Sequence, residues 1–153
     1  MSIYLVRHAK AGERDEWDGD DRLRPLSMAG LAQAERIADS LASYPIRRII
    51  SSPYRRCVET VAPLARRLRL RVEEDRGLAE GAGIEPALRL IRSLSGTSAV
   101  LCTHGDVVQE LLEHLAAQGV VDRQHARQMA KGSTWVLDER GGRLSGATYL
   151  PAP

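Results

Sequence analysis

The sequence predicts an α/β fold, a three-layer sandwich in which helices flank a mostly parallel central sheet. Short apolar runs typical of buried strands alternate along the chain with longer segments whose apolar residues recur at helical spacing. The length fits a single domain over residues 1–153, and 43% hydrophobic residues can bury a core although only 4% are aromatic. Because strands separated by helices pair in parallel, helices are expected on both faces of the sheet.

The first half of the sequence alternates strands with helices. Ser27 is suited to cap a helix, because its hydroxyl can accept a hydrogen bond from the first turn. Pro53 is favoured in the first turn of the helix that follows the second strand. The elements expected here are a strand over 2–6, a polar loop over 11–25, a helix over 27–41, a strand over 48–51, a helix over 53–68 and a weak strand over 70–73.

The second half continues this alternation and ends in two strands. Gly141 and Gly142 favour a turn between those strands, and Trp135 in the first of them is expected to pack in the core or against the sheet. The elements expected here are a helix over 86–94, a buried strand over 98–102, a helix over 106–117 and strands over 134–138 and 144–149.

A histidine follows each of the two clearest strands. Arg7 and His8 come at the end of the first strand, and His104 and Gly105 come at the end of the strand before the 106–117 helix. Functional sites in open α/β sheets lie beyond the carboxyl ends of the strands. We therefore expect the two histidines to converge at one edge of the sheet, although a lone histidine at a strand end is more often structural.

These residues meet the requirements of phosphoryl transfer to a histidine. The nucleophile must be a neutral imidazole with one unprotonated nitrogen, and His8 is the candidate. The phosphoryl oxygens need fixed donors, for which the guanidinium groups of Arg7 and Arg56 are suited. His104 and the backbone N–H groups at the following helix start could supply further positive charge.

Three segments, in order along the chain, resemble motifs of the histidine phosphatase superfamily. Residues 5–11 (LVRHAKA) resemble its opening motif, residues 51–60 (SSPYRRCVET) its second motif, and residues 102–105 (CTHG) its third. The length of the chain is similar to that of the small SixA-like branch of phosphohistidine phosphatases. The resemblance implies a phosphoglycerate mutase-like fold.

The resemblance also implies roles for individual residues. His8 would become phosphorylated, while Arg7, Arg56 and His104 would hold the phosphoryl group. Superfamily members usually have glycine where this chain has Ala9, a difference that SixA-like members often tolerate.

The choice of Arg56 rests on spacing. Arg55 is the rival candidate, and the distance along the chain back from Thr60 favours Arg56. Cysteine-based phosphatase chemistry, which needs an arginine six positions after the cysteine, is excluded because Pro63 and Val108 stand at those positions.

Three further residues are expected near the substrate. Arg24 lies in a segment that resembles SixA-like proteins and should reach the phosphate or the leaving group. Gly105 should present its backbone to the substrate at the helix start. Glu80, where larger family members place an acidic residue, is the candidate proton donor for the leaving group.

A second resemblance bears on the substrate. Residues 19–21 (GDD), 24–26 (RPL) and 131–137 (KGSTWVL) are similar to the phosphatase half of two-domain Nudix hydrolases of the MutT type, although this chain has no Nudix box. This similarity favours a nucleotide or another small phosphate over a phosphoprotein.

The hypothesis from the sequence is a phosphatase that hydrolyses a phosphohistidine or a small phosphomonoester without cofactor or metal. The alternatives are a nucleotide or sugar phosphate phosphatase, a mutase, or a module that binds phosphorylated ligands without hydrolysing them. The acidic loop over 15–21 lacks calcium-loop spacing and is expected to be solvated.

The expected partner is a phosphorylated protein or a small phosphorylated metabolite. A net charge of +2 gives no reason to expect a nucleic acid polymer or a membrane as partner. Of the 22 cationic residues only Lys10 and Lys131 are lysines. With no signal peptide pattern at the N-terminus and two cysteines far apart, a cytoplasmic location is expected.

Overall fold

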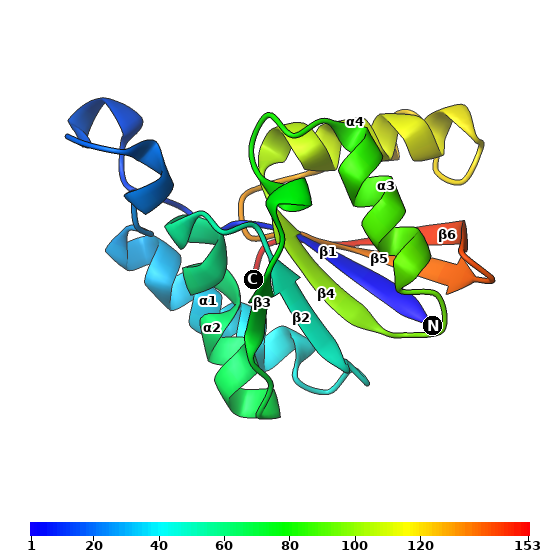
Figure 1. Cartoon of the computed structure of the whole chain (residues 1–153), viewed down its shortest axis with the longest axis horizontal. Coiled ribbons are helices and arrows are strands. Elements are labelled where there is room, and N and C mark those ends of the chain that lie inside the picture. Colours follow the sequence, from blue (N-terminus) through cyan, green and yellow to red (C-terminus); the bar gives the residue numbers. More distant parts are fainter.

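A computed structural model describes residues 1–153 and contains one six-stranded sheet between two pairs of helices (Figure 1). The strands are β1 (Ser2–Arg7), β2 (Arg48–Ser51), β3 (Val72–Glu74), β4 (Ala99–Thr103), β5 (Thr134–Arg140) and β6 (Arg143–Leu150). The α-helices are α1 (Met28–Leu41), α2 (Arg55–Leu68), α3 (Ile84–Ser93) and α4 (Gly105–Ala117). Short 3₁₀ turns are η1 (Arg14–Glu16), η2 (Asp21–Leu23), η3 (Arg76–Leu78) and η4 (His125–Arg127).

The sheet is mostly parallel, as predicted. Its strand order is β3-β2-β4-β1-β5-β6. The pairs β2–β3, β2–β4 and β1–β4 are parallel, whereas β5 runs antiparallel to both β1 and β6. Because β1 and β4 are parallel neighbours with Arg7 opposite Thr103, the residues that follow these strands reach the same edge of the sheet.

Two apolar cores, one on each face of the sheet, confirm the three-layer architecture. Ile3 and Leu5 of β1 belong to the core under α3 and α4, while Tyr4 and Val6 belong to the core under α1 and α2. This alternation explains why β1 reads as a continuous apolar run, since a strand covered on both faces buries every side chain. Trp135 is buried in the first of these cores, as expected.

Helix α2 begins two residues later than the sequence predicted. Pro53 lies before the helix, and the extended backbone of Tyr54 (ψ 135°) makes this residue the N-cap. Helix α3 begins two residues earlier than predicted, at Ile84. No helix of the chain is both long enough and apolar enough to span a bilayer.

Candidate active site

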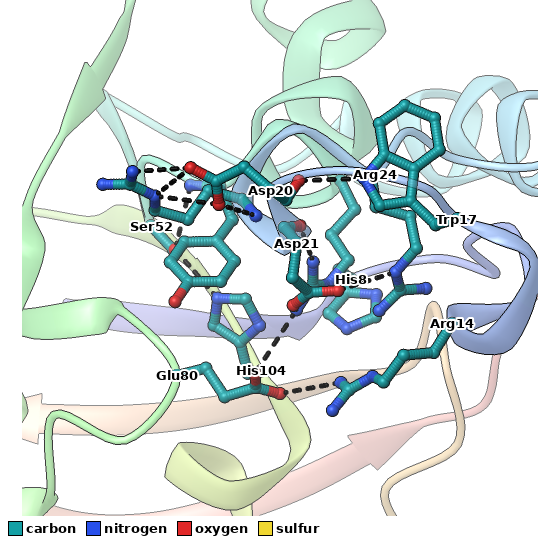
Figure 2. A network of polar contacts seen from close by, with 12 residues as sticks. His8, Arg14, Trp17, Asp20, Asp21, Arg24, Ser52, Glu80 and His104 are labelled. Atoms are coloured by element: carbon teal, nitrogen blue, oxygen red, sulfur yellow. Dashed lines mark hydrogen bonds and ion pairs between the residues drawn. The ribbon is translucent and has the colours of Figure 1, made fainter.

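The ends of β1 and β4 bring His8 and His104 together, as the strand order requires. Their ring centroids lie 5.4 Å apart with an interplanar angle of 69° (Figure 2). The His8 backbone N–H donates to the carbonyl of Thr103 at 3.0 Å, which continues the β1–β4 pairing past the last strand residue. This separation leaves both rings able to contact one small ligand.

His8 is fixed in one tautomer. Its Nδ1 lies 2.8 Å from the carbonyl oxygen of Ala9. A carbonyl oxygen can only accept, so Nδ1 carries the proton and Nε2 keeps its lone pair. The pKa of His8 is lowered to about 3, mainly because the side chain is buried. Electrostatic interactions with His104, Arg56 and Arg7 also lower it. The ring is therefore neutral at physiological pH and has one free nucleophilic nitrogen.

The turn after His8 is held by helix α2. Thr60 Oγ1 accepts from the backbone N–H of Ala9 at 2.9 Å and donates to the carbonyl of Arg56 at 2.7 Å. This contact explains the spacing of the second motif, because a threonine one helical turn after Arg56 ties the helix to the chain beside His8. Arg55, by contrast, is exposed and pairs with Glu59 at 3.4 Å.

His104 is oriented through its other nitrogen. The ring is buried and its Nε2 lies 2.9 Å from Ser52 Oγ, which itself accepts from the Tyr54 N–H at 3.3 Å. Ser52 can therefore donate its own proton to Nε2, which leaves Nδ1 as a donor. The Tyr54 ring packs edge-on against His104 with centroids 4.6 Å apart, and this packing restricts the imidazole further.

The guanidinium of Arg7 packs against Gly105, where the side chain of any other residue would clash with it. Its Nη1 donates to the carbonyl of Met129 at 2.7 Å. A Cβ added to Gly105 would lie 2.8 Å from Nη2 of Arg7. Gly105 thus lets the guanidinium lie against the start of helix α4, a packing reason for glycine that the motif alone did not reveal.

Arg56 is completely buried at the side of the site. Its Nη1 and Nη2 donate to the backbone oxygen and the carboxylate of Asp21 at 2.9 and 3.1 Å. Asp21 also accepts from Nε of the buried Arg24 at 2.9 Å (Figure 2). Burial opposes ionisation of Asp21, but Arg24 and Arg56 outweigh it and hold the pKa of this carboxyl below its usual range.

This arrangement corrects the expectation of a solvated acidic loop for Asp21, whereas Asp15, Asp18 and Asp20 are exposed as expected. Asp21 lies in the 3₁₀ turn η2 and bridges two arginines of the site, and Asp20 pairs with Arg22 at 2.6 Å. The sequence signal that was missed is the segment 19–24 itself, in which two aspartates are followed by two arginines.

Glu80 and Asp106 contribute carboxylates to the site. Glu80 forms ion pairs with Arg14 at 3.3 Å and with Arg56 at 3.6 Å (Figure 2). Asp106 accepts from the backbone N–H of Gly81 at 2.8 Å and was not among the predicted site residues.

The site opens into a cleft of about 490 Å³. All the predicted site residues except Arg56 and His104 line it, and those two lie buried behind it. The lining residues are Arg7, His8, Lys10, Ala11, Gly12, Glu13, Arg14, Arg24, Glu80, Gly105, Asp106, Gln109, Met129 and Lys131. His114 and His125, the other two histidines of the chain, do not line it.

Four buried side-chain atoms of the chain lack a hydrogen-bond partner, and all four belong to residues of this site. They are Nε of Arg7, Nε of Arg56, Nδ1 of His104 and Oδ1 of Asp106. An unsatisfied buried polar atom costs about 1–3 kcal/mol, so such atoms are rare unless a ligand satisfies them. Three of the four can donate hydrogen bonds, and unpartnered donors of this kind suit a negatively charged ligand.

A parallel-stranded α/β sandwich with two strand-end histidines among buried arginines defines the histidine phosphatase class. Residues 3–87 match the family model described as "Histidine phosphatase superfamily (branch 1)", and the chain belongs to this superfamily of phosphatases.

A curated relative that is named as a phosphatase matches nearly the whole of this chain. The 8-oxo-(d)GTP phosphatase of Mycolicibacterium smegmatis is 34% identical over 157 residues, which cover 99% of this chain and 48% of the relative. The chain thus spans about half the length of this curated relative.

Solved structures show the same fold. The SixA protein of Agrobacterium tumefaciens superposes with a TM-score of 0.78 and 28% identity over 96% of each chain. The protein histidine phosphatase SixA complexed with tungstate gives a TM-score of 0.77 over 98% of this chain and 94% of the other, at 18% identity.

Proposed function

We propose that this chain hydrolyses a phosphorylated substrate through a covalent phosphohistidine on His8. The observation that carries the proposal is the set of unpartnered donors on Arg7, Arg56 and His104 around a histidine whose Nε2 is unprotonated. All these groups belong to one sheet and its helices, so we infer that residues 1–153 act as a single catalytic unit.

In the first step Nε2 of His8 attacks phosphorus and the bond from phosphorus to the leaving group breaks. The Arg7, Arg56 and His104 donors stabilise the negative charge on the transferring oxygens. Arg24, which lines the cleft, contacts the phosphate or the leaving group, and Gly105 keeps Arg7 in place. Because the arginines supply positive charge and His104 supplies a further hydrogen-bond donor, we propose a reaction without a metal.

In the second step water attacks phospho-His8, the phosphorus–nitrogen bond breaks and orthophosphate is released. Glu80 lies in the cleft wall and is the group we assign to proton transfer, donating to a poor leaving group and accepting from the attacking water. A phosphoramidate or an aryl phosphate has a good leaving group and depends less on this residue.

For the substrate we propose a phosphohistidine or a small phosphate ester. A nucleotide is the second candidate, because the relative named as an 8-oxo-(d)GTP phosphatase matches 99% of this chain. A panel comparing kcat/KM for a phosphohistidine peptide, nucleoside triphosphates and sugar phosphates separates these candidates and also detects mutase products.

The central test is the His8→Ala variant. We expect kcat for an aryl phosphate to fall by about 10⁴-fold or more, whereas His125→Ala, which removes an exposed histidine outside the cleft, should leave it unchanged. Brief reaction of the wild-type protein with ³²P-labelled substrate should leave acid-labile label on His8. Full turnover by His8→Ala would refute the mechanism, and a chain that binds the substrate without turnover or label would be a binding module.

A further inference from the structure

The only two lysines of the chain stand together at one side of the cleft. Lys10 follows His8 by two residues, and Lys131 precedes Gly132, whose N–H donates to the backbone oxygens of Arg7 and His8 at 3.0 and 3.1 Å. Both lysines line the cleft and also a neighbouring hollow of about 320 Å³. Although they are 121 positions apart in the sequence, they flank the same stretch of backbone that carries the nucleophile.

A single glutamine holds the two lysine-bearing segments side by side. Gln33 Oε1 accepts from the Lys10 N–H at 3.2 Å, and its Nε2 donates to the Lys131 carbonyl at 2.9 Å. Two glycines allow this close packing. A Cβ on Gly30 would lie 1.9 Å from the Lys10 oxygen, and a Cβ on Gly132 would lie 2.5 Å from the Gln33 amide.

The charges of the two lysines are not neutralised by the protein. Two of the arginines that line the cleft have carboxylate partners, since Arg14 pairs with Glu80 and Arg24 pairs with Asp21. Neither lysine forms an ion pair, and both are exposed. An ammonium group is a mobile point charge with three donors, which suits a phosphate whose position varies with the substrate.

We propose that Lys10 and Lys131 form a subsite for a second phosphate of the substrate, the one bonded to the phosphoryl group that His8 accepts. The inference rests on the function proposed above and narrows its substrate class to nucleoside di- or triphosphates. The bond between the terminal phosphorus and the bridging oxygen breaks as the bond to Nε2 of His8 forms. The departing phosphate gains negative charge, which the lysines stabilise, and water then releases orthophosphate from His8.

The test compares substrates that differ in the second phosphate. We measure kcat/KM for GTP and for p-nitrophenyl phosphate with Lys10→Met, Lys131→Met and the double variant. Each single substitution should lower kcat/KM for GTP about tenfold and change the value for the aryl phosphate less than about twofold. Lys10→Arg should keep most of the GTP activity. Arg47→Met, which removes an exposed, unpaired cation at the start of β2, is the matched control and should change neither value.

Gln33→Leu tests whether the positions of the two lysines matter when both of their charges are retained. Gln33 is a positioning residue, so its loss should raise KM for GTP more than it lowers kcat and should leave the values for the aryl phosphate unchanged.

A binding measurement in the His8→Ala background separates this inference from the function itself. Titration with inorganic pyrophosphate and orthophosphate should show that the double lysine substitution weakens pyrophosphate about 100-fold and orthophosphate little. Equal losses for both anions, or none, overturn the subsite whether or not the wild type hydrolyses aryl phosphates. A selective loss toward a phosphohistidine protein would instead assign the lysines to an acidic protein surface and would also overturn it.

Discussion

Replacement of Gly105 by alanine tests whether the position of Arg7 limits the reaction. The new Cβ would lie 2.8 Å from Nη2, 2.9 Å from Cζ and 3.0 Å from Nε of Arg7, where ordinary contact begins at 3.4 Å. The guanidinium must therefore move by about 0.6 Å. Arg7 cannot move without straining the 2.7 Å bond from Nη1 to Met129. Because displacement of a catalytic group by about 1 Å can cost about 10²-fold in rate, we expect kcat/KM to fall by about 10- to 100-fold.

The stability of the protein should change little in this variant. Alanine is favoured over glycine within a helix by about 0.5–1 kcal/mol, which offsets part of the steric cost at the start of α4. Gly146→Ala is the matched control, since its Cβ would lie 2.7 Å from Asp138 Oδ2, the end of an exposed side chain that can rotate away. The measurements are kcat/KM for an aryl phosphate and the free energy of unfolding in urea. If Gly105→Ala retained kcat/KM within about threefold of wild type, Arg7 would not be the stabilising group.

Three other predictions concern His8, Ser52 and Glu80. The pKa of His8 lies at about 3 in the folded chain and near 6.5 when unfolded, so the unfolded state binds more protons between these values and stability falls as pH drops. Between pH 6.5 and 4.5 urea titrations should show that wild type loses about 2–3 kcal/mol more than His8→Gln, and equal losses would contradict the pKa. Ser52→Ala removes the contact that orients His104 and should lower kcat/KM about tenfold with unchanged far-UV circular dichroism. Glu80→Gln should slow alkyl phosphate hydrolysis about 10²-fold and aryl phosphate hydrolysis less than tenfold, and similar losses on both would remove Glu80 from proton transfer.

The convergence of the two histidines could be predicted from the sequence because it depends only on strand order. Once β1 and β4 are parallel neighbours, the residues after Arg7 and Thr103 must share an edge of the sheet. The choice of Arg56 could also be predicted, from its spacing to Thr60. The structure explains this spacing, because Thr60 hydrogen-bonds both to Ala9 and to the carbonyl of Arg56.

Contacts made by loops could not be predicted in the same way. The composition of segment 11–25 does not predict that Asp21 lies in a 3₁₀ turn and contacts Arg56. Such a short turn has no periodic sequence pattern, and its position in the chain depends on tertiary contacts. The sequence also does not predict the two hydrogen bonds of Gln33, because one side-chain amide joins two segments that are 121 residues apart. The start of α2 also differs from the prediction by two residues. The backbone of Tyr54 is extended, so the helix begins at Arg55 although proline is favoured in a first turn.

The network around Arg56 explains how a fully buried guanidinium is stabilised when no ligand is bound. A buried cation without a counterion is strongly destabilising, and the carboxylates of Asp21 and Glu80 provide that counterion at Nη2, while Nη1 donates to the backbone oxygen of Asp21. These carboxylates do not reach Nε, which is a buried donor without a hydrogen-bond partner. Arg7 differs, because its only hydrogen-bond partner is a neutral carbonyl. The positive charge of Arg56 is therefore largely neutralised by carboxylates, whereas the charges of Arg7, Lys10 and Lys131 have no carboxylate partner. Attraction of the substrate should depend on those groups, while Arg56 contributes a fixed donor that needs no rearrangement at the moment of transfer.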